Sequence, residues 1–300
     1  PLILKAAFGG GGRGMRLVQN EQELIEGFKS STKEAEVSFG RGDLYLERYL
    51  HQPKHVEVQI IADEYGNYAH VGERECSTQR RHQKIIEEAP APGISPETRT
   101  ELRQAALRIA GEFEYNSLAT VEFLVDRDEN YYFMELNARI QVEHPVSEEI
   151  SGVNLVKDQI RLADGDELQP ERYSDLRGHS MEFRINAEDP EKNFMPSSGT
   201  IRIKQIPGGH GIRFDTWIYD GAEMTPYYDS LLGKLIVTGE KRYDVITKAV
   251  SALRRFEVEG IKTNVGLHLD LIRQKKFRTG DYSITFLDEF MEKNQTEDRV

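Results

Sequence analysis

The chain has 300 residues, and its 39 lysine and arginine residues against 51 aspartate and glutamate residues give a formal net charge of −12. Apolar residues make up 38% and charged residues 30%, which excludes a disordered or low-complexity chain. No stretch reaches the roughly 18 apolar residues of a membrane span, and the acidic balance disfavours general nucleic-acid binding. The single cysteine, Cys76, excludes an internal disulfide and a cysteine-built zinc site, so we expect a cytoplasmic protein with no membrane or nucleic-acid partner.

A glycine loop near the start of the chain separates two predicted strands. The loop covers residues 8–14, and the strands cover residues 2–7 and 16–18. Because the chain opens inside a strand and without a methionine, we expect an N-terminal part of the natural protein to be missing.

The first predicted helix covers residues 21–37, with Asn20 as its N-cap and Gly40 near its end. Its apolar residues at helical spacing, which we expect on one face, are Leu24, Ile25 and Phe28.

The remaining elements alternate between short strands and helices. Predicted strands cover residues 44–48, 55–62, 68–75, 117–126, 131–137, 179–187, 199–206, 212–215 and 231–238. Predicted helices cover residues 95–113, 146–163, 242–256 and 263–274. The first of these four starts at Ser95-Pro96 and has a core stripe of Leu102, Ala106, Ile109 and Phe113. The pattern predicts an α+β fold with mostly antiparallel strands and a polar domain junction over residues 164–178.

The glycine loop has the composition of a phosphate-binding loop. Backbone N–H groups that carry no side chains can surround phosphate oxygens, and Lys5 and Arg13 supply cations nearby. The loop fits neither the Walker pattern nor the dinucleotide fingerprint. It is interpreted either as a phosphate-binding lid or as a flexible turn.

Paired carboxylates stand out in the predicted hairpin. If its turn is centred between Asp128 and Glu129, Glu122 lies directly opposite Glu135, and Asn137 shares their face. Like charges in this position repel, so a cation is expected between them, and the oxygen ligands suit Mg²⁺. A one-residue shift of the turn would remove the pairing, and the acids would then simply face water.

The segment directly after the hairpin concentrates three functional groups. Arg139 offers a planar fork for a small oxyanion, Gln141 an amide, and Glu143 a general base if burial raises its pKa. The alternative is an ordinary Arg–Glu ion pair on a loop.

A basic cluster covers residues 79–84 of this otherwise acidic chain. It is interpreted as a solvated surface or as a loop that pairs internally with Glu87 and Glu88.

Both halves of the chain contain long, distinctive motifs. They are KAAFGGGGRGMR at 5–16, ERECSTQRRHQK at 73–84, ELNARIQVEHP at 135–145, RINAEDP at 184–190, PYYDS at 226–230 and GIKTN at 260–264. Together they resemble the biotin carboxylase family of the ATP-grasp superfamily. The resemblance implies an ATP-grasp domain followed by a biotin carboxylase C-terminal domain. Residues 1–50 would be the rest of the lid with the glycine loop, 51–170 the core with the metal and bicarbonate site, and 178–290 the C-terminal domain.

The resemblance also implies a reaction. ATP and bicarbonate would form carboxyphosphate, and the carboxyl group would pass to biotin on a biotin carboxyl carrier protein. This is the first half-reaction of acetyl-CoA carboxylase or a related carboxylase, so a carboxyltransferase component is an expected partner and a homodimer the expected assembly.

The resemblance assigns roles to individual residues. ATP would be bound by Lys5, Gly10, Gly11, Gly12, Glu47, Leu50, His55, Gln79, His82, Leu124 and Ile284. Mg²⁺ or Mn²⁺ would be held by Glu122, Glu135 and Asn137. The bicarbonate and biotin residues would be Lys84, Arg139, Gln141, Val142, Glu143 as general base, Arg184 against the biotin enolate, and Asp229 orienting that arginine.

Two other interpretations stay open at this point. One is another ATP-grasp ligase of the carbamoyl-phosphate synthetase type, which would share the glycine loop and the paired acids. The other is an inactive truncated module that only binds a partner.

Overall fold

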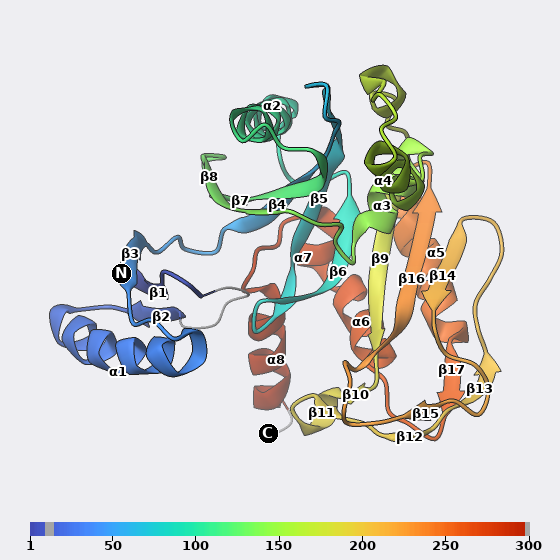
Figure 1. The fold of residues 1–300 in the computed structure, drawn as a ribbon. Helices are drawn as coiled ribbons and strands as arrows, with labels where there is room; N and C mark the ends of the chain where they lie inside the picture. Colours follow the sequence, from blue (N-terminus) through green and yellow to red (C-terminus); the bar gives the residue numbers. More distant parts are fainter. Residues whose placement is uncertain (10–14, 298–300) are drawn as a thin grey trace. The chain divides into compact units, whose positions relative to one another are not determined.

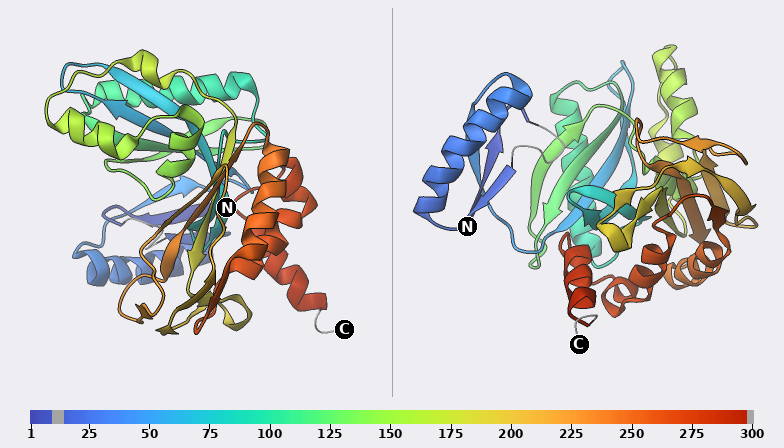
Figure 2. Two further views of the ribbon diagram at one scale, coloured as in Figure 1. Left: turned by 90° about the vertical axis from the view of Figure 1, so that its right-hand side faces the viewer. Right: turned by 90° about the horizontal axis from the view of Figure 1, so that it is seen from below.

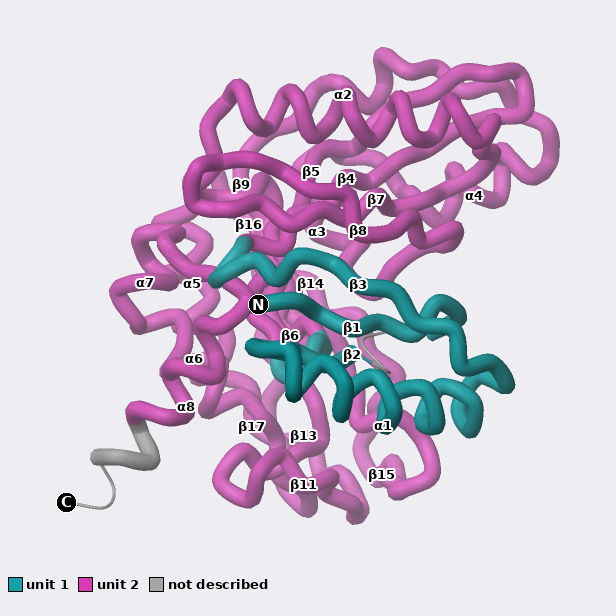
Figure 3. The backbone as a smooth tube through the Cα atoms, turned by 90° about the vertical axis from the view of Figure 1, so that its left-hand side faces the viewer, with its two compact units in different colours: residues 1–53, 80–83 teal, residues 54–79, 84–300 magenta. Residues whose placement is uncertain are grey.

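The computed structural model describes residues 1–9 and 15–297, and its chain separates into two compact units (Figure 3). Unit 1 consists of residues 1–53 and 80–83, and unit 2 of the rest. The expected glycines Gly10, Gly11 and Gly12 lie outside the described residues. No helix in the described part of the chain combines the length and apolarity needed to cross a membrane.

Unit 1 is a three-stranded antiparallel sheet in the order β2–β1–β3 with one helix against it. Its elements are β1 (Leu2–Ala6), β2 (Met15–Val18), α1 (Glu21–Phe39) and β3 (Leu44–Arg48). The predicted caps of α1 are confirmed: the Asn20 side chain accepts a hydrogen bond from the Glu23 backbone N–H, and Gly40 ends the helix in a left-handed conformation.

The apolar residues of α1 share one face, as predicted, but that face is not the buried one. The helix buries Gly27, Ser31 and Ala35 against the sheet, while Ile25 and Phe28 are about half exposed. A Cβ added at Gly27 would lie within 3.2 Å of Leu4, so small residues are what allow the helix to approach the strands.

Unit 2 is built on an eight-stranded sheet in the order β14–β16–β9–β6–β5–β4–β7–β8 (Figure 1). Its strands are β4 (Lys54–Ala62), β5 (Tyr68–Arg80), β6 (Gln83–Ala89), β7 (Ser117–Val125), β8 (Tyr131–Asn137), β9 (His179–Asn186), β14 (Ile212–Thr216) and β16 (Leu231–Gly239). The pairs β14–β16–β9–β6 and β5–β4–β7–β8 run antiparallel, as the sequence predicted.

The other elements of unit 2 surround this sheet. The helices are α2 (Pro96–Glu112), α3 (His144–Ser151), α4 (Leu155–Ala163), α5 (Arg242–Arg255), α6 (Val265–Arg273), α7 (Lys275–Thr279), α8 (Phe286–Glu297) and the short 3₁₀ turns η1 (Pro170–Tyr173) and η2 (Pro190–Lys192). Short strand pairs are formed by β10 (Glu188–Asp189) with β11 (Met195–Pro196), β12 (Gly199–Thr200) with β15 (Glu223–Met224), and β13 (Arg202–Gln205) with β17 (Glu257–Glu259).

Strand β4 divides its side chains between two environments. Val56, Val58 and Ile60 pack against α2 in an apolar core, whereas the alternate residues His55 and Glu57 lie on the opposite face. In α2 the predicted core residues Leu102 and Ala106 are fully buried, but Phe113 is 70% exposed because the helix ends at Glu112 and Phe113 is its C-cap.

A second core lies between β9, β16 and the C-terminal helices, which run together along one side of these strands in orange and red (Figure 2). Met181, Phe183 and Ile185 alternate along β9 toward α5 and α6. The helices α7 and α8 were missed by the sequence prediction, because each is short or continues the polar C-terminal stretch.

Two boundaries differ from prediction in ways that matter for the site. The single helix expected over residues 146–163 is two helices, since Gly152 adopts a left-handed conformation (φ 71°) and Asn154 caps α4. The basic cluster at 79–84 is the end of a β-hairpin: β5 continues to Arg80, an exposed tight turn follows at Arg81 and His82, and β6 starts at Gln83.

Gly260 tests whether the close backbone approach beside the short strand pairs requires a glycine. It has φ 90°, and a Cβ placed there would lie 1.9 Å from the Thr200 carbonyl oxygen. We expect Gly260→Ala to lower the free energy of unfolding by about 2–4 kcal/mol in urea titrations. The matched change Gly266→Ala, on the exposed side of α6 with open space around it, should stabilise by about 0.5 kcal/mol. Equal effects of the two substitutions would contradict this account.

Candidate active site

A row of charged side chains crosses four adjacent strands of the sheet in unit 2. Arg74 on β5 lies opposite Glu57 on β4, Glu57 opposite Glu122 on β7, and Glu122 opposite Glu135 on β8. The first three are buried and Glu135 is exposed. Carboxylates in direct opposition repel one another, so the row requires cations from neighbouring elements.

Arg74 supplies the first cation. It is fully buried, and its Nε lies 2.5 Å from a Glu57 oxygen. Its other N–H groups donate to Gln59, Thr120, Gln141 and Ser147. Burial lowers the pKa of Arg74, but the charges of Glu57 and Glu143 outweigh that effect and raise it, so the guanidinium stays charged.

Lys84 supplies the second cation. Its Nζ lies 2.5 Å from Glu57, 2.6 Å from Glu143 and 3.2 Å from Glu122. Burial lowers the pKa of Lys84, yet the three carboxylates more than compensate and hold the pKa well above its usual value. Lys84 is therefore a fixed positive charge and not a base.

The predicted pairing of Glu122 with Glu135 is confirmed, although the turn that was assumed for it is not. Near the turn, Val125 pairs with Tyr131 and Phe123 with Phe133, one residue out of the expected register. A β-bulge between these pairs and the acids restores the alignment, so that Glu122 faces Glu135 and Thr120 faces Asn137.

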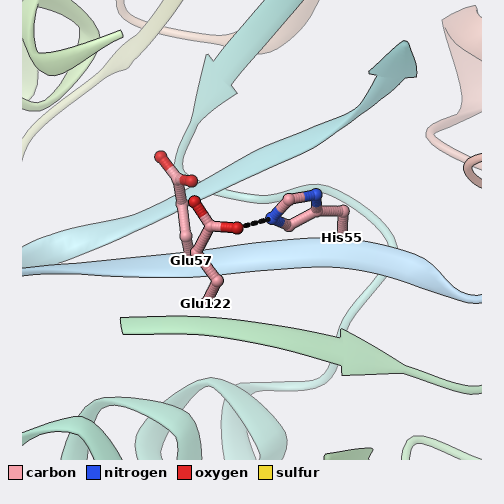
Figure 4. A group of neighbouring side chains, drawn as sticks. All are labelled: His55, Glu57 and Glu122. Atoms are coloured by element: carbon pink, nitrogen blue, oxygen red, sulfur yellow. Dashed lines mark ion pairs between the residues drawn. The ribbon is translucent and has the colours of Figure 1, made fainter. Parts of the chain in front are cut away.

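Asn137 and His55 hold the acidic pair in place. The Asn137 amide Nδ2 donates to Glu122 at 3.0 Å and to Glu135 at 3.2 Å. His55 Nε2 lies 2.9 Å from the second Glu122 oxygen, and Figure 4 shows this contact beside Glu57. The Gln79 side-chain amide nitrogen lies 2.6 Å from His55 Nδ1, so the imidazole ring is held between Gln79 and Glu122.

This arrangement suits a hard divalent cation. Glu122 and Glu135 present oxygen ligands on one face, and ligand atoms of His55, Glu57 and Glu122 all lie within 4.8 Å of one another. Mg²⁺ prefers carboxylate oxygen to imidazole nitrogen, so the two opposed glutamates are the better candidates as its ligands, with His55 in contact with Glu122. The three residues predicted to hold the metal thus come together.

The condition set for Glu143 as a base, a pKa raised by burial, is not met. Burial does act in that direction, but Lys84, Arg184 and Arg74 surround the carboxylate and hold its pKa below the usual range. The same competition lowers the pKa of Glu122, where burial is outweighed by His55 and Lys84. Both carboxylates are ionised at neutral pH.

Arg184 approaches Glu143 from the other half of the chain. It lies on β9, with Nη2 3.0 Å from Glu143 and 2.6 Å from Glu87 on β6. Its backbone carbonyl accepts hydrogen bonds from Asn264 and His268, which fixes the strand at this point. Asp229, expected to orient Arg184, is exposed and accepts a hydrogen bond from the Leu231 backbone N–H.

The sequence analysis allowed ion pairs between the basic cluster at 79–84 and Glu87 or Glu88, but both glutamates pair with other residues. Glu87 forms an ion pair with Arg184, and Glu88 is held by His179 and Arg242.

The segment after β8 contributes one buried residue and two exposed ones to this site. Gln141 is buried, accepts from Arg74 and donates to Glu122. Arg139 is exposed and donates to the Asn137 side chain at 3.3 Å. Val142 is partly exposed, and its carbonyl accepts from Lys234 on β16 at 2.7 Å.

The remaining predicted ATP residues are distributed over both units. In unit 1, Lys5 and Glu47 form an ion pair at 2.7 Å, Leu50 is half-buried, and His82 lies in the tight turn with φ 66°. In unit 2, Leu124 pairs with His55 across the sheet and Ile284 is half-buried between α7 and α8.

Several site residues escaped the sequence analysis. They are Glu57, Arg74, Glu87 and Lys234. A signal existed for Glu57, because His55, Glu57 and Gln59 alternate with valine and isoleucine along one predicted strand and mark its second face as polar.

Comparison with known proteins agrees with this geometry. Residues 1–171 match the family of the carbamoyl-phosphate synthase L chain, ATP binding domain, and residues 182–289 match the biotin carboxylase C-terminal domain. The first match alone would fit either class of ligase, whereas the second separates them. The chain belongs to the biotin carboxylase family. The fold class predicted from the sequence is confirmed, with an ATP-grasp part followed by this C-terminal domain.

Members of the family resemble the chain closely. It is 48% identical over 293 residues to the 2-oxoglutarate carboxylase small subunit of Hydrogenobacter thermophilus, covering 96% of this chain and 61% of that protein. It is 48% identical over 290 residues to the biotin carboxylase of Pseudomonas aeruginosa, covering 96% of this chain and 64% of that protein. The chain therefore spans less than two thirds of these relatives.

A solved relative gives the same fold. The biotin carboxylase domain dimer of H. thermophilus 2-oxoglutarate carboxylase, in complex with MgADP, ADP and bicarbonate, superposes with a TM-score of 0.92 at 46% identity. The match covers 96% of this chain and 64% of that one.

Lys84 should be essential for stability as well as for any activity. We expect Lys84→Met to lower the free energy of unfolding by about 3–5 kcal/mol at neutral pH, because three buried carboxylates lose their shared cation. The pKa values of Glu122 and Glu143 are depressed in the fold, so their stabilisation is present above the ordinary value of 4.5 and lost as the pH falls. The difference between variant and wild type should therefore shrink in acid.

Chemical denaturation at several pH values measures this effect, with Lys276→Met as the matched control. Lys276 forms an exposed ion pair with Glu289, and its loss should cost less than about 1 kcal/mol. Similar losses in the two variants would contradict the central role of Lys84.

Proposed function

We propose that the protein containing this chain is an ATP-dependent ligase that carboxylates biotin on a carrier protein with bicarbonate. The observation that carries the proposal is the position of Glu143, buried between Lys84 and Arg184 beside the opposed acids Glu122 and Glu135. A base, two anion-binding cations and a candidate metal site then share one face of one sheet. The MgADP and bicarbonate bound to the H. thermophilus relative support this assignment.

ATP would be bound as its magnesium complex. Glu122, Glu135 and Asn137 would hold Mg²⁺ or Mn²⁺, whose charge offsets that of the phosphates. Lys84 would face the transferred phosphoryl group, and Lys5 with the glycine loop Gly10–Gly12 would cover the phosphates. Glu47, Leu50, His55, Gln79, His82, Leu124 and Ile284 would surround the nucleoside.

Bicarbonate would lie against the segment after β8. Arg139, the Gln141 amide and the Val142 backbone N–H would bind its oxygens, while Lys234 fixes the Val142 peptide through its carbonyl. Glu143 is ionised and so is able to accept the bicarbonate proton. Its basicity would increase when bound nucleotide draws Lys84 toward the phosphates, because that cation lowers the pKa of Glu143 in the present arrangement.

Biotin would be deprotonated and carboxylated beside Arg184. A guanidinium that is already held at two carboxylates does not need to reorganise when negative charge develops on the ureido oxygen. Asp229, two residues before β16, accepts from the Leu231 backbone N–H, and its proposed role is to orient Arg184.

The partners follow from the same reaction. A biotin carboxyl carrier protein would deliver biotin, a carboxyltransferase component would use carboxybiotin, and the assembly would be a homodimer in the cytoplasm. The carboxyl group would finally pass to acetyl-CoA or to the substrate of a related carboxylase. The domain division into residues 1–50, 51–170 and 178–290 also remains a prediction, which limited proteolysis tests.

ADP release decides between this function and its alternatives. In the whole protein that contains this chain, Mg-ATP should yield ADP only when bicarbonate and biotin are both present. Glu143→Gln should lower kcat by about 10²–10⁴-fold, because proton abstraction from bicarbonate is lost. The matched control is Glu97→Gln, an exposed acid in the first turn of α2, which should leave the rate unchanged.

Other outcomes would point elsewhere. ADP release that depends on an amine or another carboxylate instead of biotin would favour a different ATP-grasp ligase. A folded protein that binds the carrier but never hydrolyses ATP would favour the interaction module.

A further inference from the structure

Two buried glutamates face each other next to Arg184, and one of them contacts it. Glu87 on β6 pairs with Glu182 on β9 across the antiparallel ladder, and neither side chain is exposed to solvent. Side chains in this relation have Cβ atoms about 4.5–5.5 Å apart, within reach of a direct hydrogen bond between carboxyl groups. Neither residue was singled out as a site residue by its sequence context.

The hydrogen bonds of this pair are incomplete. Within residues 1–9 and 15–297, both carboxyl oxygens of Glu182 and Oε2 of Glu87 are buried without a hydrogen-bond partner. The other Glu87 oxygen accepts from Arg184 Nε at 2.6 Å. Two ionised carboxylates placed side by side in this dry position would repel strongly, whereas one proton converts Glu182 into a donor for the unpaired Glu87 oxygen.

The surrounding charges determine which carboxyl keeps the proton. The groups that face the pair are Arg184 on β9, Lys84 on β6, Lys234 on β16 and Glu143 at the start of α3. Burial raises the pKa of Glu87 to about 7 even though Arg184 opposes the shift. Burial and the charge of Glu87 raise the pKa of Glu182 well above its usual value, so the proton resides on Glu182.

We propose that Glu87 and Glu182 share a single proton, carried by Glu182, and that the remaining negative charge on Glu87 positions Arg184 beside Glu143. The inference rests on the proposed function only for the role of Arg184 toward biotin. Glu87 is then a positioning residue. Protonated Glu182 donates a hydrogen bond to the Glu87 oxygen that Arg184 does not contact. Protonation of Glu87 would release one of the two anchors of the guanidinium.

Stability measured without substrates tests the shared proton. A group whose pKa is raised by folding stabilises at low pH and loses that stabilisation as the pH rises. Wild type should therefore lose thermal stability relative to Glu182→Gln between about pH 5 and pH 9, by a few degrees in Tm. Glu240→Gln, at an exposed position after β16, should give a difference from wild type that does not change with pH.

Infrared spectroscopy gives an independent readout. A protonated buried carboxyl has a carbonyl stretch distinct from that of a carboxylate, and this band should be present in wild type at neutral pH and absent in Glu182→Gln. The proposal of a shared proton would be overturned if this infrared band were absent from wild type. It would also be overturned if the Tm difference between wild type and Glu182→Gln did not change with pH.

Kinetics in the whole protein test the positioning role. Glu87→Gln should lower kcat/KM for biotin at least about tenfold, with the KM for ATP unchanged, and Glu87→Asp should restore part of it. In wild type kcat/KM for biotin should fall as the pH drops below about 7, where Glu87 takes a proton. Glu87→Gln should abolish this acid limb.

The outcomes separate the two proposals. Retention of both the biotin kcat/KM and the acid limb in Glu87→Gln would overturn positioning. A protein that releases ADP without need of biotin would overturn the proposed function, while the stability and infrared measurements would still decide whether the proton is shared.

Discussion

Burial of carboxylates is the constraint on which this structure depends. Glu57, Glu122 and Glu143 lie where water cannot stabilise their charges, and the free energy cost of leaving any of them unpaired exceeds that of most single interactions in a protein. Three cations offset that cost: Arg74, Lys84 and Arg184. Each contacts at least one carboxylate, and Lys84 contacts three. The charged network therefore holds together only as a whole.

The strand order explains how such a network assembles. The cations come from β5, β6 and β9, and the carboxylates from β4, β7 and the start of α3, so the groups meet only when these strands become neighbours. On β4 the opposite face supplies the apolar core with α2, which fixes the pleat and with it the side to which Glu57 points. Packing of ordinary hydrophobic residues thus sets the geometry of the charged face.

The sequence revealed the local parts of this arrangement and missed the distant ones. The pairing of Glu122 with Glu135 could be predicted because both residues lie in one hairpin. The turn position assumed for that hairpin was wrong by one residue, but a β-bulge shifts the register back before the two acids. Arg74 and Glu87 were not predicted, since their partners lie 17 and 97 residues away along the chain and no local pattern joins them. The low pKa of Glu143 was missed for the same reason: burial was foreseeable from the segment, but the three cations that outweigh it, Lys84, Arg184 and Arg74, come from distant strands. Likewise, α1 exposes Ile25 and Phe28 because small residues on its other face allow closer contact with its sheet, which hydrophobicity alone does not indicate.

The same cations that stabilise the fold also restrain the chemistry. Glu143 is ionised because Lys84 and Arg184 are close, and the same proximity makes it a weak base. In the proposed reaction, a substrate that attracts Lys84 would do two things together: it would occupy the site and it would strengthen the base. Arg184 differs, because Glu87 remains as its second anchor when Glu143 takes a proton. In the proposed reaction the lysine would be the cation that substrate redistributes, and the arginine the one that stays in place while charge develops in front of it.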